Sequence, residues 1–260
     1  MTTAFIHSFQ GEWLKKKRSL ASWLVVGGAF FIPSILLAIR IANFGKLPEM
    51  YAAEDFWAAL WKQSWEPMAT FLMPIGIILA TALIAQIEYK NNGWKQLHTT
   101  PQTFTTIFFA KLLVIVSMFA GLMILFNVGI FLVAVIPAAL FASVPYPSAL
   151  IPYELFLTRN LKFFLDSLPI LGLQYLLSLQ FKNFLVPLGI GFFLWMLCLG
   201  FLSWEHSYIF PYAYSSLDHF ANSGDLPARK YNLQIIAIGY FAVFTLAGYL
   251  LYITKRDKGE

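Results

Sequence analysis

Long apolar segments are the feature that most constrains the fold of this chain. They cover residues 20–41, 67–86, 106–136, 163–180, 184–203 and 233–254. A helix needs about 20 mostly apolar residues to cross a bilayer core about 30 Å thick. Because lipid cannot satisfy open backbone groups, such segments must be helical. The sequence therefore predicts an all-α polytopic membrane protein, with six transmembrane helices in one domain over residues 1–260.

The composition excludes a soluble enzyme and a disordered chain. Hydrophobic residues make up 59% of the sequence and charged residues only 12%, whereas a soluble globular protein carries about 25% charged residues. So few charges cannot cover a surface that faces water. The single cysteine, Cys198, lies inside an apolar segment, which excludes a disulfide framework and a thiolate zinc site.

The third apolar stretch, residues 106–141, is too long for one crossing, because at about 1.5 Å per residue it exceeds 50 Å. We interpret it as one span over residues 106–136 that ends at Pro137 and continues into an interfacial segment. A division into two spans near Asn127 and Gly129 is the alternative, although no polar turn lies there.

The distribution of Lys and Arg predicts the orientation. With the N-terminus inside, the inner segments hold 11 basic and 4 acidic residues, a net charge of +7, and the outer segments carry −2. Basic residues accumulate on the cytoplasmic side of membrane proteins, so we expect both termini in the cytoplasm. The first apolar segment is longer than the roughly 7–15 residues of a signal-peptide core, so we do not expect a cleavable signal peptide.

The N-terminal segment, residues 4–18, predicts an amphipathic helix on the inner leaflet. Phe5, Phe9 and Trp13 recur near helical spacing, and the basic run 15–18 follows them. Apolar side chains would enter the interface while Lys and Arg contact lipid headgroups. A simple basic anchor for the first span is an alternative that is compatible with this interpretation.

Motifs for nucleotide, hydrolase, metalloprotease or thiol chemistry are absent from the sequence. It contains no G-x-x-x-x-G-K-[ST], G-x-S-x-G, H-E-x-x-H or C-x-x-C. Glu205, His206, Asp218 and His219 share the last outer segment and could form a carboxylate–imidazole metal site. Their spacing matches no known ligand pattern, so we favour solvated loop residues and expect neither a metal nor a catalytic site.

The inner segment 86–101 is the longest cytoplasmic connection and is rich in groups that form protein contacts. Thr100 and Pro101 are typical of a helix start, so we expect a short helix, a break and a second helix. A solvated hairpin is the alternative, but Trp and Tyr are frequent interface anchors. The residues that we expect to dock on a soluble partner are Glu88, Tyr89, Lys90, Gly93, Trp94, Leu97 and Pro101.

The first outer segment carries Trp57, Trp61 and Trp65 at i, i+4 and i+8, which is one stripe of a short helix. Tryptophan is enriched at membrane interfaces, so the favoured interpretation is an interfacial helix at the outer headgroups. The functional alternative is an aromatic wall that receives a hydrophobic or amphipathic substrate.

The predicted spans hold few polar side chains. Gln174 and Ser178 lie one turn apart in the fourth span, Asp166 lies near its outer end, and Asn127 lies in the third span. Gln174, Ser178 and Asn127 either line a substrate path or form hydrogen bonds with a neighbouring helix. The lack of charge pairs argues against an ion-coupled pump and suits a substrate that is itself apolar.

Three motifs together resemble the membrane subunits of type-2 ABC exporters. Glu12 and the basic run 15–18 stand directly before the first span. The inner segment then places an acid, a Gly–Trp pair and a proline before Lys111, which opens the next span. The turn over residues 174–183 is similar to the bacteriocin-immunity and lantibiotic-export branch. The resemblance covers essentially the whole chain.

The resemblance implies a permease that is powered by a separate P-loop ATPase, which binds ATP and Mg, so this chain itself needs no cofactor. Two permeases, identical or different, would pair in the inner membrane of a bacterium. The segment 88–97 would be the coupling helix, and the substrate an antimicrobial peptide, a lipopeptide or a lipid. An intramembrane enzyme and a six-helix channel or scaffold without ATP coupling remain the alternatives.

Overall fold

The computed structural model describes residues 2–17, 19–90, 102–224, 226 and 231–254. Within these residues the secondary structure consists of helices, joined by turns and short loops. The α-helices are α1 Thr2–Lys16, α2 Leu20–Ala42, α3 Leu47–Ala52, α4 Phe56–Pro67, α5 Met73–Lys90, α7 Phe104–Leu140, α8 Tyr153–Gln180, α9 Leu185–Gly200, α10 Tyr214–Ser223 and α11 Leu233–Thr254.

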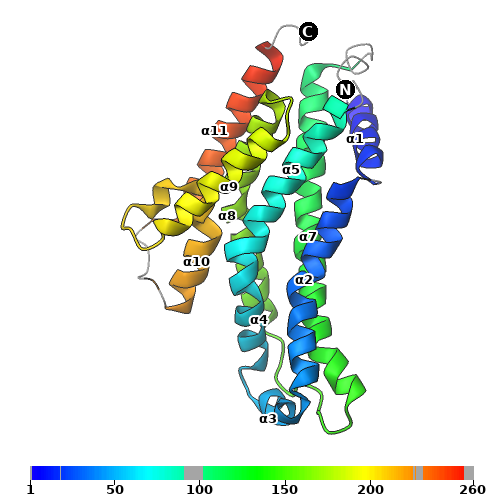
Figure 1. Ribbon diagram of the computed structural model, residues 1–260, viewed down its shortest axis with the longest axis vertical. Coiled ribbons are helices and arrows are strands. Elements are labelled where there is room, and N and C mark those ends of the chain that lie inside the picture. The colour runs from blue at the N-terminus through cyan, green and yellow to red at the C-terminus, as the bar shows by residue number, and fades with distance from the viewer. Residues whose placement is uncertain (1, 18, 91–101, 225, 227–230, 255–260) are drawn as a thin grey trace.

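The helices form an elongated bundle in which α8 is a central element (Figure 1). It packs most extensively along α11 and α5, and it also contacts α7, α9 and α10. A second layer is formed by α2, which runs along α7, and by α1, which lies against α7 near one end of the bundle. That end also holds the end of α5, the start of α7 and the end of α11, whereas α3 lies at the opposite end (Figure 1).

Four helices within the described residues are long and apolar enough to cross a membrane. They are α2, the continuous helical stretch Phe56–Ile87, α7 and α11. The apolar helix α9 is shorter, and the first half of α8 carries Glu154, Arg159, Lys162 and Asp166. The prediction of an all-α, multi-pass protein is confirmed, whereas the count of six spans stays a prediction.

The helix α7 continues without a break through Pro137, from Phe104 to Leu140, so the expected interfacial continuation after Pro137 is helical for three more residues; where the span itself ends stays a prediction. A proline has no N–H to donate to the carbonyl four residues earlier, which leaves that group without its helical partner. Here the hydroxyl of Tyr51 lies 2.9 Å from the carbonyl oxygen of Ala134 and 3.4 Å from that of Val133. Arg40 donates to the same hydroxyl at 3.2 Å. Pro137 leaves the carbonyl of Val133 without its helical donor, and the Tyr51 hydroxyl lies beside this carbonyl and that of its neighbour Ala134, so the helix continues.

The second predicted span also extends further than expected, since its helix begins at Phe56 rather than at residue 67. A π-helical turn, Met68–Leu72, joins α4 to α5 directly after Pro67. Such turns leave carbonyl groups with weaker helical partners. Ser215 of α10 donates to the carbonyl oxygen of Ala69 at 2.9 Å, and Trp195 of α9 donates to that of Thr70 at 3.0 Å. Neighbouring helices thus stabilise the irregular turn.

Other helix ends show where local sequence signals succeed and fail. The bounds of α11 match the predicted span 233–254, and α2 continues through Pro33 as expected. Two starts differ from the prediction: α8 begins at Tyr153 instead of residue 163, and α7 begins at Phe104 instead of at Pro101. The N-cap of α7 is Thr103, whose hydroxyl accepts a hydrogen bond from the N–H of Thr106 at 3.2 Å. Thr100 and Pro101 lie outside the described residues.

The contact between α2 and α7 predicts a strong effect of one glycine. A Cβ atom on Gly129 would lie 2.7 Å from Cγ of Pro33, and a proline ring cannot rotate away. We therefore expect Gly129→Ala to lower the free energy of unfolding by about 1–3 kcal/mol through overpacking, measured as the melting temperature in detergent. Gly121→Ala in the same helix is the matched control, because nothing lies within 4 Å of its Cβ position. Equal melting temperatures for the two variants would contradict the close contact.

Candidate functional site

The inner segment that the sequence predicts to dock on a partner is bounded by two well-anchored helix ends. Of the predicted docking residues, the structure describes the side chain of Tyr89. Its hydroxyl donates to the carbonyl oxygen of Leu179, near the end of α8, at 3.0 Å. Burial raises the pKa of Tyr89 to about 12, so the hydroxyl stays protonated as a donor. The side chains of Glu88 and Lys90, and the whole of Gly93, Trp94, Leu97 and Pro101, lie outside the described residues.

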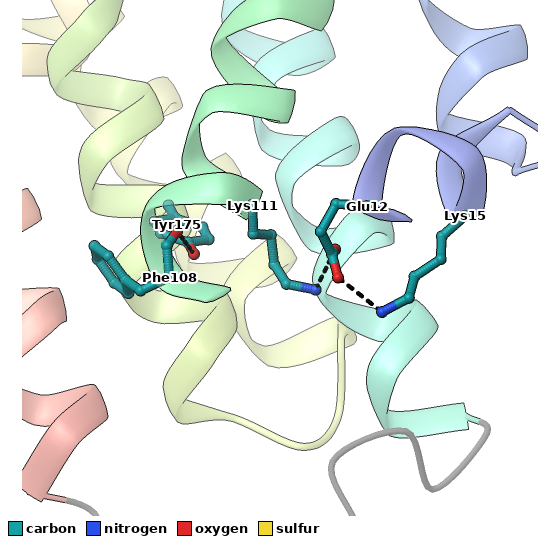
Figure 2. Close-up of polar contacts among 5 residues, drawn as sticks. All are labelled: Glu12, Lys15, Phe108, Lys111 and Tyr175. Atoms are coloured by element: carbon teal, nitrogen blue, oxygen red, sulfur yellow. Dashed lines mark hydrogen bonds and ion pairs between the residues drawn. The ribbon is translucent and has the colours of Figure 1, made fainter. Parts of the chain in front are cut away.

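The start of α7, on the other side of this segment, is fixed to α8 and α11. The hydroxyl of Tyr175 in α8 donates to the carbonyl oxygen of Phe108 at 2.9 Å (Figure 2). The hydroxyls of Thr105 and Tyr249, which belongs to α11, lie 2.8 Å apart. A displacement of the start of α7 would therefore act directly on two other long helices.

A buried ion pair joins α1 to the same part of α7. Nζ of Lys111 lies 2.9 Å from one carboxylate oxygen of Glu12, and Nζ of Lys15 lies 2.7 Å from the other (Figure 2). The side chains of Lys111 and Glu12 are only 2% and 8% exposed. Removing one partner of a buried ion pair leaves an uncompensated charge, which costs about 3–5 kcal/mol. This pair therefore fixes α1 against α7.

The polar side of α1 faces the bundle. Ser8 and Glu12 are buried, while Ile6 and Leu14 are exposed and Trp13 lies at the border. A helix is thus present at the N-terminus, with Ile6 and Leu14 directed away from its protein contacts, whereas Phe9 of the predicted stripe packs against the core. Its position at a lipid interface stays a prediction. The sequence placed Glu12 and Lys111 in two separate motifs, and their pairing was missed because it depends on how α1 packs against α7.

The polar residues predicted for a substrate path contact neighbouring helices. Gln174 is buried and donates through Nε2 to the hydroxyl of Tyr212 at 2.7 Å. Asn127 and Asn160 exchange two amide hydrogen bonds, of 3.0 and 3.1 Å, between α7 and α8. Ser178 is buried as well, and its hydroxyl has no hydrogen-bond partner in the described part of the chain. Gln174 and Asn127 therefore form hydrogen bonds with neighbouring helices, which was one of the two expected roles. These contacts explain their presence without a role in a substrate path.

The aromatic stripe of α4 forms at the expected spacing, but its side chains are directed into the protein. Trp57, Trp61 and Trp65 are 3%, 8% and 0% exposed. The ring of Trp65 stacks on Phe163 of α8 with centroids 4.5 Å apart, and Trp57 stacks on Phe131 of α7 at 6.1 Å. The indoles are therefore covered by aromatic side chains of two other helices; the position of α4 at a lipid interface stays a prediction.

The last outer segment also differs in part from the prediction of solvated loop residues. Glu205 and His206 are exposed, but Asp218 and His219 belong to α10 and are buried. Asp166 in α8 is fully buried and accepts hydrogen bonds from Gln234 at 3.0 and 3.2 Å. Within the described residues, no three His, Cys, Asp or Glu side chains are grouped so that they could hold a metal ion.

The comparison with known proteins identifies one family. The family model described as "ABC-2 family transporter protein" matches residues 8–198, which include most of α1, the inner segment, α7 and α8. No curated protein matches the sequence significantly.

The buried ion pair predicts strong coupling between two positions that lie far apart in the sequence. We expect Glu12→Gln or Lys111→Met alone to lower the melting temperature substantially, and the double variant to lower it by much less than the sum. A double-mutant cycle should give a coupling free energy of at least about 1 kcal/mol. Lys15→Gln is the control, because this side chain is 39% exposed and an exposed pair contributes at most about 1 kcal/mol. Additive effects would show that the pair does not hold α1.

Proposed function

Because the chain belongs to the ABC-2 transporter family, whose members are membrane subunits that work with an ABC ATPase, we propose that it is the permease of an ATP-driven exporter. The substrate would be hydrophobic or amphipathic: an antimicrobial peptide, a lipopeptide or a lipid. ATP and Mg would bind to the partner ATPase, and this chain would contribute the path through the membrane. A second permease, identical or different, would complete the transporter.

The observation that supports coupling is the anchoring on both sides of segment 91–101. Tyr89 connects the end of α5 to α8, Tyr175 connects the start of α7 to α8, and Lys111 connects α7 to α1. A partner that moves this segment would therefore act on four helices at once. Coupling requires contacts that differ between two states of the partner, and the anchored helix ends on both sides would pass such a difference to the bundle.

The small number of ionised groups in the long apolar helices supports an apolar substrate. The long apolar helices carry few ionised groups, and the buried Lys111 is already paired with Glu12. A pathway for a charged solute or a proton would need ionisable groups that face it. The resemblance to the lantibiotic and bacteriocin branch supports a membrane-active peptide as substrate, and export or expulsion from the membrane as the direction.

The coupling proposal predicts the effect of Trp94→Ala. If Trp94 is an anchor in a groove of the ATPase, the substitution should weaken docking by about 2 kcal/mol or more, which is roughly thirtyfold in affinity. The variant permease should accumulate in the membrane but lose the ATPase during purification in detergent, and it should lose transport. The measurement is the amount of ATPase that co-purifies with the tagged permease.

The matched control for this experiment is Trp204→Ala, which removes an indole that is 45% exposed in the segment after α9. This variant should keep its ATPase. If Trp94→Ala also keeps its partner and full transport, segment 88–97 is not the coupling helix. If Trp94→Ala fails to accumulate, Trp94 supports the fold and does not act as a docking anchor.

The charge distribution predicts that both termini lie in the cytoplasm. Single cysteines at Ser148 and Asn183 test this, because both positions are exposed and lie in different connections, before α8 and between α8 and α9. The native Cys198 is buried, and its replacement by Ala gives a clean background. We expect a membrane-impermeant maleimide to label position 148 in intact cells and position 183 only after lysis. The reverse pattern would overturn the orientation.

A further inference from the structure

A cavity of about 110 Å³ lies where α4, α8 and α10 meet. It is part of neither the inner segment nor the predicted polar path. A stripe of α8 forms one side, with Leu155, Arg159 and Phe163 at i, i+4 and i+8, while α4 contributes Trp61 and Lys62. A cavity needs roughly 10–15 Å³ to hold one water, so this one has room for a group of several heavy atoms.

The cationic side chains of the cavity favour an anionic group. Arg159 and Lys62 line it, and none of the described residues that line it is acidic. Nη1 of Arg159 is shielded from solvent and has no hydrogen-bond partner among the described residues. A guanidinium group binds phosphate or carboxylate oxygens through paired N–H donors. A donor that is buried without a partner is costly to the protein, and an oxyanion in the cavity would satisfy it.

An acid of α10 that acts electrostatically on Arg159 has another hydrogen-bond partner. Asp218 of α10 interacts electrostatically with Arg159 and Lys162. Its carboxylate accepts a hydrogen bond from Nδ2 of Asn222 at 2.9 Å. Arg159 forms no ion pair with it in the described part of the chain. Asp218 thus orients the amide of Asn222 at the edge of the cavity and leaves Arg159 available to a ligand.

Aromatic and apolar groups complete the cavity. The rings of Trp61 and Phe163 stack with centroids 5.8 Å apart, and His219 stacks on Phe163 at 6.4 Å. Leu155 is 40% exposed and forms part of the rim. A ligand with both charged and apolar parts could therefore place its anionic group at Arg159 and Lys62 and its apolar part along Leu155 and the indole of Trp61.

We propose that this cavity binds the phosphate group of an anionic, lipid-like molecule. The proposal deepens the proposed function, because a phosphate-bearing amphipathic molecule would then be a substrate. Only the claim that the bound molecule is transported rests on that function. Arg159 provides the paired donors, Lys62 provides a second positive charge at the open side, and Trp61 with Phe163 provides the apolar wall.

The test measures binding of dihexanoylphosphatidylglycerol to the purified full chain in an uncharged detergent, by isothermal titration calorimetry without any ATPase. We expect the wild-type chain to bind it, and Arg159→Gln and Lys62→Gln each to weaken binding by about tenfold or more, as the loss of one charge-assisted hydrogen bond does. Lys46→Gln is the matched control, since Lys46 is an exposed lysine that does not line the cavity. Its affinity should equal that of the wild type.

Competition measurements identify the source of the phosphate, and three other results would contradict the proposal. Competition by inorganic phosphate at a concentration similar to that of the lipid would indicate a site for free phosphate, and much weaker competition would indicate a lipid headgroup. Equal binding of uncharged dihexanoylglycerol, unchanged affinity of Lys62→Gln, or preference for a peptide carboxylate would overturn the proposal. If Arg159→Gln does not fold, Lys62→Gln decides, because this exposed side chain supports no packing. Loss of ATPase docking would leave this result unaffected.

Discussion

The burial of Lys111 determines how the end of the bundle that holds α1 and the start of α7 is assembled. A lysine that is 2% exposed needs a counter-charge within reach, because an isolated charge in apolar surroundings would destabilise the fold by several kcal/mol. Glu12 supplies this charge from a helix that precedes all the long apolar helices. The pair thereby fixes α1 across α7, close to the point where Phe108 accepts the hydrogen bond from Tyr175. The position of α1 and the start of α7 thus follow from one electrostatic requirement.

The same requirement, that polar groups have partners, explains the irregular parts of the long helices. Pro137 removes the backbone donor to Val133, and the π-helical turn Met68–Leu72 interrupts the regular pairing after Pro67. In apolar surroundings the carbonyls affected cannot turn to water. Donors arrive from distant parts of the chain: Tyr51 at Val133 and Ala134, Ser215 at Ala69 and Trp195 at Thr70. Each of these irregular points therefore becomes a polar contact between helices.

The parts of the structure that the sequence could predict are those set by local length and hydropathy. The ends of α11 and α2 follow from where an apolar run begins and stops. The continuation of α7 past Pro137 could not be predicted in this way, because the compensating Tyr51 lies more than 80 residues away. The stripe of Trp57, Trp61 and Trp65 was expected at the lipid interface. Indoles favour both that interface and buried aromatic clusters, so the sequence alone does not distinguish the two positions. In the candidate site, Glu12 and Lys111 could be seen as motif residues, but their contact depends on the packing of α1, which no local pattern reports.

The π-helical turn at Met68–Leu72 has a mechanical consequence for the helical stretch in which it lies. The 18 residues of α5 extend about 27 Å beyond the turn at 1.5 Å per residue. A change of 10° in the bend would displace the far end of this lever by about 5 Å, close to the rise of one helical turn. Ser215 and Trp195 donate hydrogen bonds to this turn, so its resistance to bending depends on two side-chain hydrogen bonds. A small change of the bend at the π-helical turn would therefore produce a large displacement of the end of α5 that carries Tyr89.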